Sequence, residues 1–343
     1  MSEPVREPVS YILPIKSSAP DTSPELREYI AWLAARAEVI VVDGSAPATF
    51  AAHEREWGAS IRHVAPAPDL ISPMGKVGGV LTGLRLASHE HVIIADDDVR
   101  YDEESLAQTV AALATADVVR PQNYFEPLPW HARWDSGRML LNRLTGGDWP
   151  GTLGVRRSRL QATNGYDGSV MFENLELVRT VLASGGRERV LYGAYVLRRP
   201  STTQHFWSQR VRQAYDEIAR PARFIAQLAL LPLAIALAIT GHWLAIAIGS
   251  AATVIAAELG RRRARATRVF PASTPLFAPF WVAERAICSW LALGARILLG
   301  GVPYRGTILH SAATPMRVLR QRHAARAEQA VVLPATAAPR RSA

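Results

Sequence analysis

Three consecutive aspartates, Asp96, Asp97 and Asp98, are the residues whose type and spacing point most directly to chemistry. They follow an apolar run at residues 92–95 that is typical of a buried strand. Neighbouring carboxylates repel one another unless a cation compensates, and Mg²⁺ or Mn²⁺ is such a cation because it prefers oxygen ligands. Alternate residues of an extended chain point to one side, so Asp96 and Asp98 could bind one ion while Asp97 faces away. The alternative is a solvated acidic loop before the next helix, because residues 102–104 are also acidic.

The elements around these aspartates alternate between strand and helix patterns. Strands are predicted at residues 9–15, 39–42, 60–64 and 92–95, and helices at residues 23–37 and 78–88. This alternation predicts an α/β domain with a mostly parallel sheet covered on both faces. Ligands of such sheets bind at the carboxyl ends of the strands, where Asp43 and the three aspartates lie.

The middle of the chain gives weaker signals. Residues 121–153 are rich in Pro, Trp and Gly, which favours long loops that either cover the sheet or line an acceptor cleft. A helix is expected at residues 173–184 and a strand at residues 190–197. From about residue 329 the composition is low in complexity and predicts disorder.

Two apolar runs, at residues 224–240 and 243–259, are separated only by Gly241 and His242. Their length is near the lower limit for crossing a bilayer, and together they predict a tight helical hairpin. A pair of buried core helices is the soluble alternative. The basic sequence RRRARATR at residues 261–268 favours the membrane, because a hairpin that crosses and returns leaves this cluster on the cytoplasmic side.

A third apolar stretch, residues 276–299, contains Glu284, Arg285 and Arg296. Ionisable residues are costly in lipid, so we expect a helix in the membrane interface, with a third crossing as the alternative. The sequence thus predicts a cytosolic domain at residues 1–215, a membrane domain at residues 216–310 and a basic, largely disordered tail at residues 311–343.

The overall charge and the single cysteine agree with this location. The net charge of +9 could indicate nucleic-acid binding, but arginines beside apolar segments favour a membrane surface and no nucleic acid. Cys288 cannot form an intramolecular disulfide, which is typical of a reducing compartment. The start of the sequence, MSEPVREPVS, contains no apolar segment typical of a signal peptide, so we expect the globular part in the cytosol.

Several motifs, in order, resemble those of family 2 glycosyltransferases, in particular the membrane-bound, lipid-modifying branch. They are VSYILPI at 9–15, VIVVDGS at 39–45, KVGGVLTGLRLAS at 76–88, VIIADDDV at 92–99, GTLGVRRSRL at 151–160, NGYDGSVMFENLEL at 164–177, QRVRQ at 209–213 and GGVPYRG at 300–306. The resemblance covers roughly residues 8 to 310 and lies more in the order and spacing of the motifs than in any one of them.

The resemblance implies a GT-A fold and the transfer of a sugar from a UDP- or GDP-sugar to a lipid acceptor at the cytoplasmic face of the cell membrane. It places Asp43 at the nucleotide, Asp96 and Asp98 at the ribose and a Mg²⁺ or Mn²⁺ ion, and Lys76 near the donor phosphates.

The resemblance also assigns the residues that would complete the reaction. Gln209 would contact the donor, while Arg210 and Arg212 would neutralise the leaving diphosphate. Glu173 and Glu176 share a helix face and are the candidates for the base that takes the acceptor proton.

Two positions depart from the family pattern. The acidic pair of the family is Glu173-Asn174 in this chain, and the final Trp of its QxxRW motif is Gln213. Both departures argue against a processive polysaccharide synthase, and they leave open an acceptor that is already an anion and needs no base. They also leave open a catalytically degenerate protein that serves as an assembly partner in envelope glycan synthesis. A nucleotidyltransferase is a further alternative, disfavoured because no glycine-rich, lysine-containing loop follows the first strand.

Overall fold

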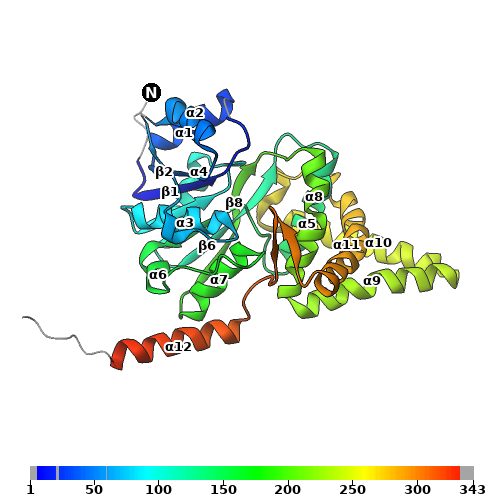
Figure 1. Cartoon of the computed structure of the whole chain (residues 1–343). Helices are drawn as coiled ribbons and strands as arrows, with labels where there is room; N and C mark the ends of the chain where they lie inside the picture. Colours follow the sequence, from blue (N-terminus) through cyan, green and yellow to red (C-terminus); the bar gives the residue numbers. More distant parts are fainter. Residues whose placement is uncertain (1–5, 21–22, 59, 333–343) are drawn as a thin grey trace, which may run out of the picture.

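The computed structural model describes residues 6–20, 23–58 and 60–332. An eight-stranded sheet with the order β3-β2-β1-β4-β7-β6-β8-β5 forms the centre of the N-terminal part (Figure 1). The strands are β1 (Val9–Ile15), β2 (Glu38–Asp43), β3 (Arg62–Val64), β4 (His91–Ala95), β5 (Val99–Arg100), β6 (Val118–Phe125), β7 (Thr152–Arg156) and β8 (Glu188–Arg198). Four neighbouring pairs are parallel, and the pairs made by β7 and β5 are antiparallel. The mostly parallel α/β sheet expected from the sequence is confirmed.

Helices cover both faces of this sheet. They are α1 (Pro24–Ala34), α2 (Pro47–Trp57), α3 (Gly75–Leu86), α4 (Glu103–Leu113), α5 (Trp130–Leu144), α6 (Arg157–Ala162), α7 (Glu173–Ala183) and α8 (Thr203–Tyr215), with short 3₁₀ turns η1 (Pro68–Leu70) and η2 (Asp216–Ala219). The expected helices at residues 23–37, 78–88 and 173–184 correspond to α1, α3 and α7.

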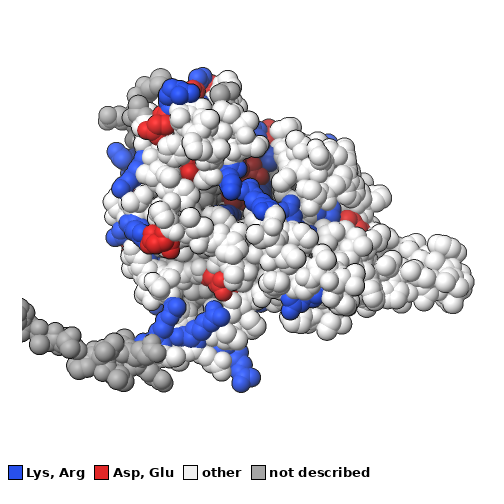
Figure 2. Space-filling model, in the orientation of Figure 1, with Lys and Arg blue, Asp and Glu red and all other residues white. Residues whose placement is uncertain are grey.

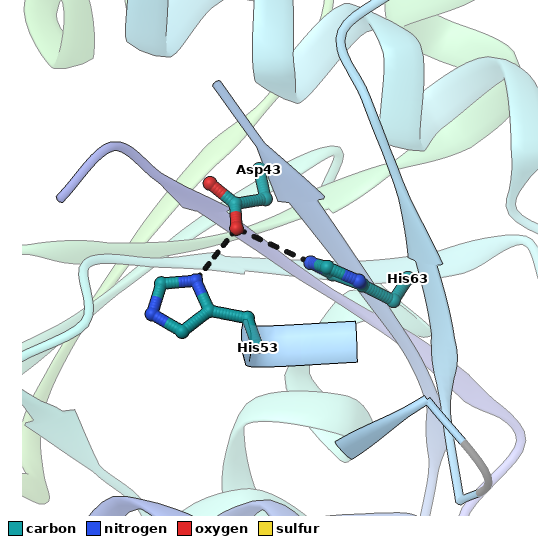
Figure 3. A group of neighbouring side chains, drawn as sticks. All are labelled: Asp43, His53 and His63. Atoms are coloured by element: carbon teal, nitrogen blue, oxygen red, sulfur yellow. Dashed lines mark hydrogen bonds and ion pairs between the residues drawn. The ribbon is translucent and has the colours of Figure 1, made fainter. Parts of the chain in front are cut away.

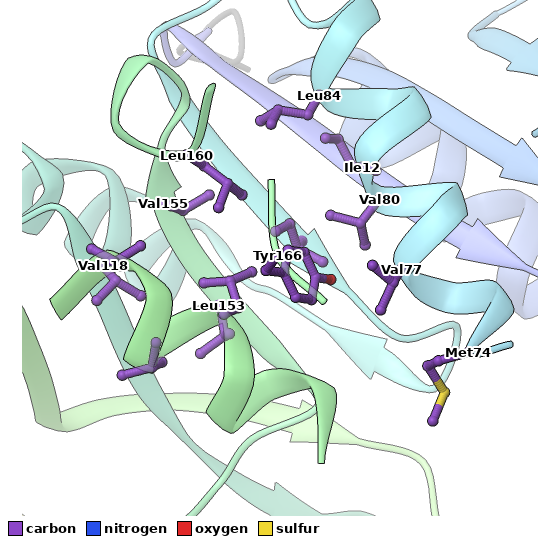
Figure 4. Close-up of a cluster of buried hydrophobic side chains, with 14 of the residues drawn as sticks. Ile12, Met74, Val77, Val80, Leu84, Val118, Leu153, Val155, Leu160 and Tyr166 are labelled. Atoms are coloured by element: carbon purple, nitrogen blue, oxygen red, sulfur yellow. The ribbon is translucent and has the colours of Figure 1, made fainter. Parts of the chain in front are cut away.

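Alternation along β1 divides the core into two layers. Ile12 packs with Val80 and Leu84 of α3 on one face (Figure 4), and Tyr11 and Leu13 pack on the other. A β-carbon at Gly83 would lie 2.4 Å from Ile12 Cγ2, so glycine is what allows α3 to lie this close to β1. This close packing fixes where the N-terminus of α3 meets the edge of the sheet.

Residues 121–153 were expected to form long loops, and this prediction is wrong. They contribute most of β6 and all of α5. Their apolar pattern is hidden because both elements bury polar side chains, including Gln122 and Asn123 of β6 and Asp135 and Arg143 of α5.

The C-terminal part consists of long helices followed by a small hairpin and a final helix. The elements are α9 (Pro221–Ile239), α10 (Trp243–Arg262), η3 (Arg263–Arg268), η4 (Thr274–Phe277), α11 (Ala278–Leu298), β9 (Val302–Tyr304), β10 (Thr307–Leu309) and α12 (Met316–Val332). Helices α9 and α10 form the expected hairpin, which projects away from the sheet (Figure 1). Three helical segments, Pro221–Ile239, Trp243–Arg268 and Thr274–Leu298, are long and apolar enough to cross a membrane.

Helix α11 differs from the hairpin because it packs against α5, α8 and α9. It buries Glu284, Arg285 and Ser289 on this side, while Phe280 and Leu291 are exposed on the other. Two of the three charges that made residues 276–299 unsuitable for lipid, Glu284 and Arg285, therefore face protein. Arg296 is exposed near the end of the helix and donates to Gly300 O at 2.8 Å.

The tail expected to be largely disordered is in part helical. Residues 316–332 form α12, which packs against α7, and the expected disorder at residues 333–343 lies outside the described residues.

Candidate functional site

The carboxyl end of β4 holds the aspartate cluster. The backbone N–H of Asp96 donates to Gly151 O at 2.8 Å, which ties the cluster to the start of β7. A β-carbon on Gly151 would approach Asp96 Oδ2 to 2.7 Å, so this position requires glycine. Asp96 and Asp98 are partly buried and both face Arg198, whereas Asp97 is exposed. Asp96 and Asp98 therefore lie toward one side and Asp97 away, as expected. The reason differs from the expected extended chain, because residues 97 and 98 form a turn in which the Val99 N–H donates to Asp96 O at 3.1 Å.

Lys76 joins two of the predicted site carboxylates. It lies in the first turn of α3, and its Nζ lies 2.6 Å from Asp96 Oδ1 and 2.7 Å from Glu173 Oε1. Burial opposes the charged ammonium, but the carboxylates of Asp96 and Glu173 outweigh it and raise the pKa of Lys76 well above its usual value. Lys76 is therefore a charged ammonium that bridges β4 and α7 in this structure.

Arg198 is a second cation of the cluster, and the sequence reading missed it. It ends β8, and its Nε donates to Asp98 Oδ2 at 2.8 Å while its Nη2 lies 3.5 Å from Asp96 Oδ2. Pairing of β5 with β8 brings Arg198 opposite Val99, immediately beside the aspartates. The sequence offered one signal, a basic residue at the end of a predicted strand. It could not show that Arg198 contacts Asp98, which lies 100 residues earlier.

The cluster fits a divalent cation. Asp98 Oδ1 is buried and has no hydrogen-bond partner among the residues that the structure describes. Burial raises the pKa of Asp98, although Arg198 opposes this effect. An unpaired buried carboxylate oxygen beside a second carboxylate is the donor set that Mg²⁺ or Mn²⁺ takes, so Asp98 and Asp96 would hold such an ion.

The position of Glu173 is set by a distant part of the chain. Immediately before α7, the backbone N–H groups of Met171 and Phe172 donate to the carbonyls of Ser311 and Ala312, at 2.9 and 2.8 Å. Residues 310–314 thus fix the first turn of α7 against the site. Asn174 points elsewhere and donates to Pro150 O at 3.3 Å.

Glu176 does not face the cluster, which corrects its prediction as a second candidate base. It is fully buried, and its Oε2 accepts the backbone N–H of Thr314 at 2.6 Å. It lines a separate cavity of about 230 Å³ between α7 and α12. A separation of three residues rotates the side chain about 60° around the helix axis, and the C-terminal segment occupies that direction.

Asp43 is also not accessible to a ligand in this structure. Its Oδ1 accepts the backbone N–H of Ser45 at 2.8 Å, and its Oδ2 faces His53 and His63. Its side chain has no exposed surface. Burial opposes ionisation, but hydrogen bonds from Ser45 and His53 keep the pKa of Asp43 below its usual value. Direct contact with a nucleotide, as predicted, would require the two histidines to move.

Arg210 is a structural residue rather than a phosphate ligand. It is 2% exposed, and its guanidinium pairs with both oxygens of Asp135 at 2.7 and 3.2 Å and lies 3.6 Å from Glu284. Its predicted role at the leaving diphosphate is therefore wrong for this conformation, because α5 and α11 enclose it.

The other predicted residues of α8 remain partly accessible. Arg212 lies 5.7 Å from the ring centre of Tyr304, in the β9–β10 hairpin. Burial lowers the pKa of His205, and the nearby positive charge of Arg212 lowers it further, while Asp98 opposes them. Gln209 is half-buried and contacts His205 and Gln213.

Basic and acidic side chains meet in a hollow at the middle of the molecular face shown in Figure 2. The projecting α9–α10 hairpin shows no charged side chain on this face (Figure 2). A charged hollow thus lies next to an apolar projection.

The comparisons with known proteins give distant structural similarity only. By sequence, the chain matches no known protein family and no curated protein. Among solved structures it resembles a mannosyltransferase from Pyrobaculum calidifontis in complex with GDP-Man and Mn²⁺, with 17% identity and a TM-score of 0.47 over 95% of this chain and 86% of that one.

Two further structures are similar at a comparable level. One is mannosyl-3-phosphoglycerate synthase from Rubrobacter xylanophilus, with 16% identity, a TM-score of 0.42 and coverage of 63% of this chain and 74% of that one. The other is glucosyl-3-phosphoglycerate synthase from Mycobacterium tuberculosis in complex with Mn²⁺ and UDP-glucose, with 16% identity, a TM-score of 0.40 and coverage of 58% and 73%. With TM-scores below 0.5, the case for a function rests on the chain's own residues.

Proposed function

We propose that this chain is a metal-dependent, inverting glycosyltransferase that moves a sugar from a UDP- or GDP-sugar to a lipid or lipid-linked acceptor at the cytoplasmic membrane face. The observation that carries the proposal is the group of Asp96, Asp98, Lys76, Arg198 and Glu173, in which carboxylates and cations converge at the carboxyl end of β4. The order of the sequence motifs supports a GT-A assignment for the domain.

Each residue of this group has a role in such a transfer. The acceptor oxygen attacks the anomeric carbon, the bond to the nucleoside diphosphate breaks, and the leaving group gains negative charge. Lys76, Arg198 and Arg212 are the cations that can bind its phosphates. An ion held by Asp96 and Asp98 supplies Lewis-acid stabilisation of the same charge.

Glu173 is the residue proposed to take the acceptor proton. It is the only carboxylate of α7 that contacts the cluster among the described residues, because Glu176 is bound to Thr314. Its ion pair with Lys76 holds its carboxylate toward Asp96, where the acceptor and donor must meet. The lysine can then move to the donor phosphates when the donor binds.

The arrangement of the C-terminal helices supports a membrane acceptor. Helices α9 and α10 have 19 and 20 residues, so each is about 30 Å long, which matches the apolar thickness of a bilayer. Both ends of α11 are tied to the α/β domain: Arg133 of α5 bonds Ser273 just before it, and residues 310–314 contact α7 after it. We therefore place the hairpin across the membrane and α11 in the interface.

Exposed aromatic residues support the same placement. Trp130, Trp207, Phe280 and Trp290 are each 44–55% exposed, and the first three join a cluster with Trp134 and Phe206. Tryptophans gather at membrane–water interfaces because one part of the ring system is apolar and its N–H is polar. Of the two roles considered for residues 121–153, covering the sheet or lining an acceptor cleft, the exposed tryptophans favour the second.

The test is metal-dependent binding and turnover of nucleotide-sugars by the purified full chain. Thermal stabilisation by UDP- and GDP-sugars is measured with and without Mn²⁺, and transfer is measured to lipid extracts. Asp98→Ala is expected to abolish metal-dependent donor binding and Asp96→Ala to weaken it strongly. Asp97→Ala is the matched control and keeps binding, because its side chain is exposed. Equal losses in all three variants would indicate a plain acidic loop.

A catalytically degenerate assembly partner is the second candidate. It is favoured by Asn174, whose neutral amide donates to Pro150 O at the position where the family has a carboxylate. Donor binding without any turnover, across all sugars and lipid acceptors tested, would support this candidate over the enzyme.

A further inference from the structure

A second group of potential ligands lies apart from the aspartate cluster, around Asp43. His53 comes from α2 and His63 from β3, and both imidazoles point toward the carboxylate at the end of β2 (Figure 3). His53 Nδ1 lies 2.7 Å and His63 Nε2 lies 3.3 Å from Asp43 Oδ2. The three side chains are at most 1% exposed. The sequence reading overlooked both histidines.

Neutral imidazoles do not supply enough N–H donors for the carboxylate oxygens of this group. An ionised carboxylate only accepts hydrogen bonds, and a neutral imidazole donates through one nitrogen only. His63 has a carboxylate oxygen at each nitrogen, because its Nδ1 lies 2.5 Å from Glu54 Oε2. As hydrogen bonds alone, these contacts require a doubly protonated, buried His63 or a protonated carboxylate.

A metal ion removes this difficulty. With a cation between Asp43 Oδ2, His53 Nδ1 and His63 Nε2, His63 stays neutral and its Nδ1–H donates to Glu54. Metal-bound histidines characteristically donate their second N–H to a carboxylate, which fixes the ring. Stacking holds both rings further, since His63 lies on Phe50 with centroids 4.3 Å apart and His53 on Trp57 at 4.4 Å.

We propose that Asp43, His53 and His63 form a binding site for a transition-metal ion of the zinc type. Two imidazoles and one carboxylate are a donor set that suits Zn²⁺, whereas Mg²⁺ prefers oxygen ligands. With bonds of about 2.0 Å in a tetrahedron, ligand atoms lie about 3.3 Å apart. The Asp43–His63 distance of 3.3 Å already has this value, whereas His53 Nδ1, at 2.7 Å from Asp43 Oδ2, would have to move outward by about 0.6 Å to admit the ion. The described ligand atoms all lie within 4.8 Å of one another.

The structure also indicates what such an ion would do. Its ligands come from β2, α2 and β3, so it would fasten the outer strands of the sheet to the helix beside them. Ser45, which follows Asp43, donates its N–H to Asp43 Oδ1 and accepts the N–H of Ser17 on its hydroxyl. The ion would therefore hold the loops after β1 and β2 in place. This inference goes beyond the proposed function and does not depend on it.

The experiment measures metal bound to the full chain, purified in detergent without a polyhistidine tag. Elemental analysis is expected to find about one zinc per chain. After removal of metal with a chelator, zinc is titrated back against a chromophoric chelator of known affinity. His53→Gln and His63→Gln are expected to weaken zinc binding at least 100-fold, and Glu54→Gln by about 10- to 100-fold. His91→Gln, a histidine of β4 outside the group, is the matched control and keeps the affinity of the unaltered chain.

Two additional measurements show whether a variant binds zinc weakly because it lacks a ligand or because it is unfolded. Circular dichroism identifies any variant that is unfolded, and Asp43→Asn provides a substitution of nearly unchanged shape. Calorimetry in buffers of different ionisation enthalpy is expected to show proton release on zinc binding, because the ion replaces protons in the group. Folded variants that bind zinc as tightly as the unaltered chain, or an unaltered chain that binds none, would overturn the proposal. Neither result affects Mn²⁺ binding by Asp98, so failure here is distinct from failure of the proposed function.

Discussion

At the scale of single residues, the cluster at the end of β4 combines groups that would be unfavourable alone. Asp96 pairs with both Lys76 and Arg198, whereas Asp98 pairs with Arg198, and each of these two cations contacts two carboxylates. Each charge is thus neutralised by an opposite charge. A nucleotide-sugar donor and a metal ion would therefore replace existing ion pairs.

The base assignment predicts different outcomes for the two glutamates of α7. Glu173→Gln is expected to reduce sugar transfer about 10²- to 10⁴-fold, the usual contribution of general acid–base catalysis, with donor affinity retained. Glu176→Gln is the control, because its amide oxygen can still accept the Thr314 N–H, and it is expected to keep transfer. Transfer rates and donor affinities are measured separately. Full transfer by Glu173→Gln would exclude this base and favour an acceptor that is already an anion.

A buried acid beside the site predicts a pH dependence of stability. Burial raises the pKa of Asp216 to about 8, with further contributions from Glu173 and Glu217. Between about pH 4 and pH 8 the folded chain therefore holds a proton that the unfolded chain has lost, so the free energy of unfolding falls as pH rises. Asp216→Asn is expected to remove this dependence and to raise the Tm most at pH 8 and above. Thermal unfolding from pH 5 to 9 tests this, with the exposed Asp69→Asn as control; parallel curves for Asp216→Asn and the unaltered chain would contradict it.

At the scale of elements, a network of ion pairs joins the α/β domain to the C-terminal helices. Arg210 of α8 lies between Asp135 of α5 and Glu284 of α11. Glu217 of η2 pairs with Arg220, immediately before α9, and with Arg223 in the first turn of α9. Charged contacts therefore set how the domain sits on α9 and α11.

This network predicts that Arg210→Met destabilises the fold. Removing one partner of a buried pair leaves a charge without compensation, which costs about 3–5 kcal/mol. The control Arg212→Met is expected to cost little stability, because Arg212 is only partly buried, but to weaken donor binding. Denaturant unfolding and donor titration measure the two effects. An Arg210→Met variant with normal stability and lost donor binding would restore Arg210 to a role at the diphosphate.

The comparison of sequence and structure shows which elements could be predicted. Runs with a clear period, such as residues 9–15 and 92–95, gave the right strands. The expectation that Asp96 and Asp98 face one side was also right, but a turn at residues 97–98 places them there rather than strand alternation. Helix α5 was missed because polar residues such as Asp135 and Arg143 fill its buried face.

The parts of the site that could not be predicted depend on contacts between distant residues. Nothing near Arg198 indicates that β8 brings it to Asp98, and nothing near Glu176 indicates that Thr314 binds it. The local sequence pattern shows which residue types lie at a strand or helix end. It does not show which way each side chain points, because that depends on contacts with residues far away in the sequence.

At the scale of the whole molecule, both ends of the hairpin and both ends of α11 meet the α/β domain. Arg263, after α10, stacks on Tyr192 of β8, with its guanidinium carbon 3.5 Å from the ring centre. In the proposed topology, α9 and α10 therefore cross the membrane together. We expect α11 to stay on the side of the α/β domain, because residues 310–314 after it contact α7.

Topology is tested with single cysteines in a Cys288→Ser background. A cysteine at position 241, in the turn of the hairpin, is expected to react with a membrane-impermeant thiol reagent added outside the cell. Cysteines at positions 273 and 311 are expected to react only after the membrane is permeabilised. Labelling of position 311 from outside would show that α11 crosses.

The contacts that hold the start of α7 have a consequence for how the protein is made. Ser311 and Ala312 emerge from the ribosome only after the hairpin and α11, yet their carbonyls bind the N–H groups just before Glu173. During translation, the α/β domain can therefore build its sheet early, but the segment before the Glu173 helix pairs with residues 311 and 312 only after the hairpin has been made. If the hairpin enters the membrane as proposed, completion of the site follows that insertion.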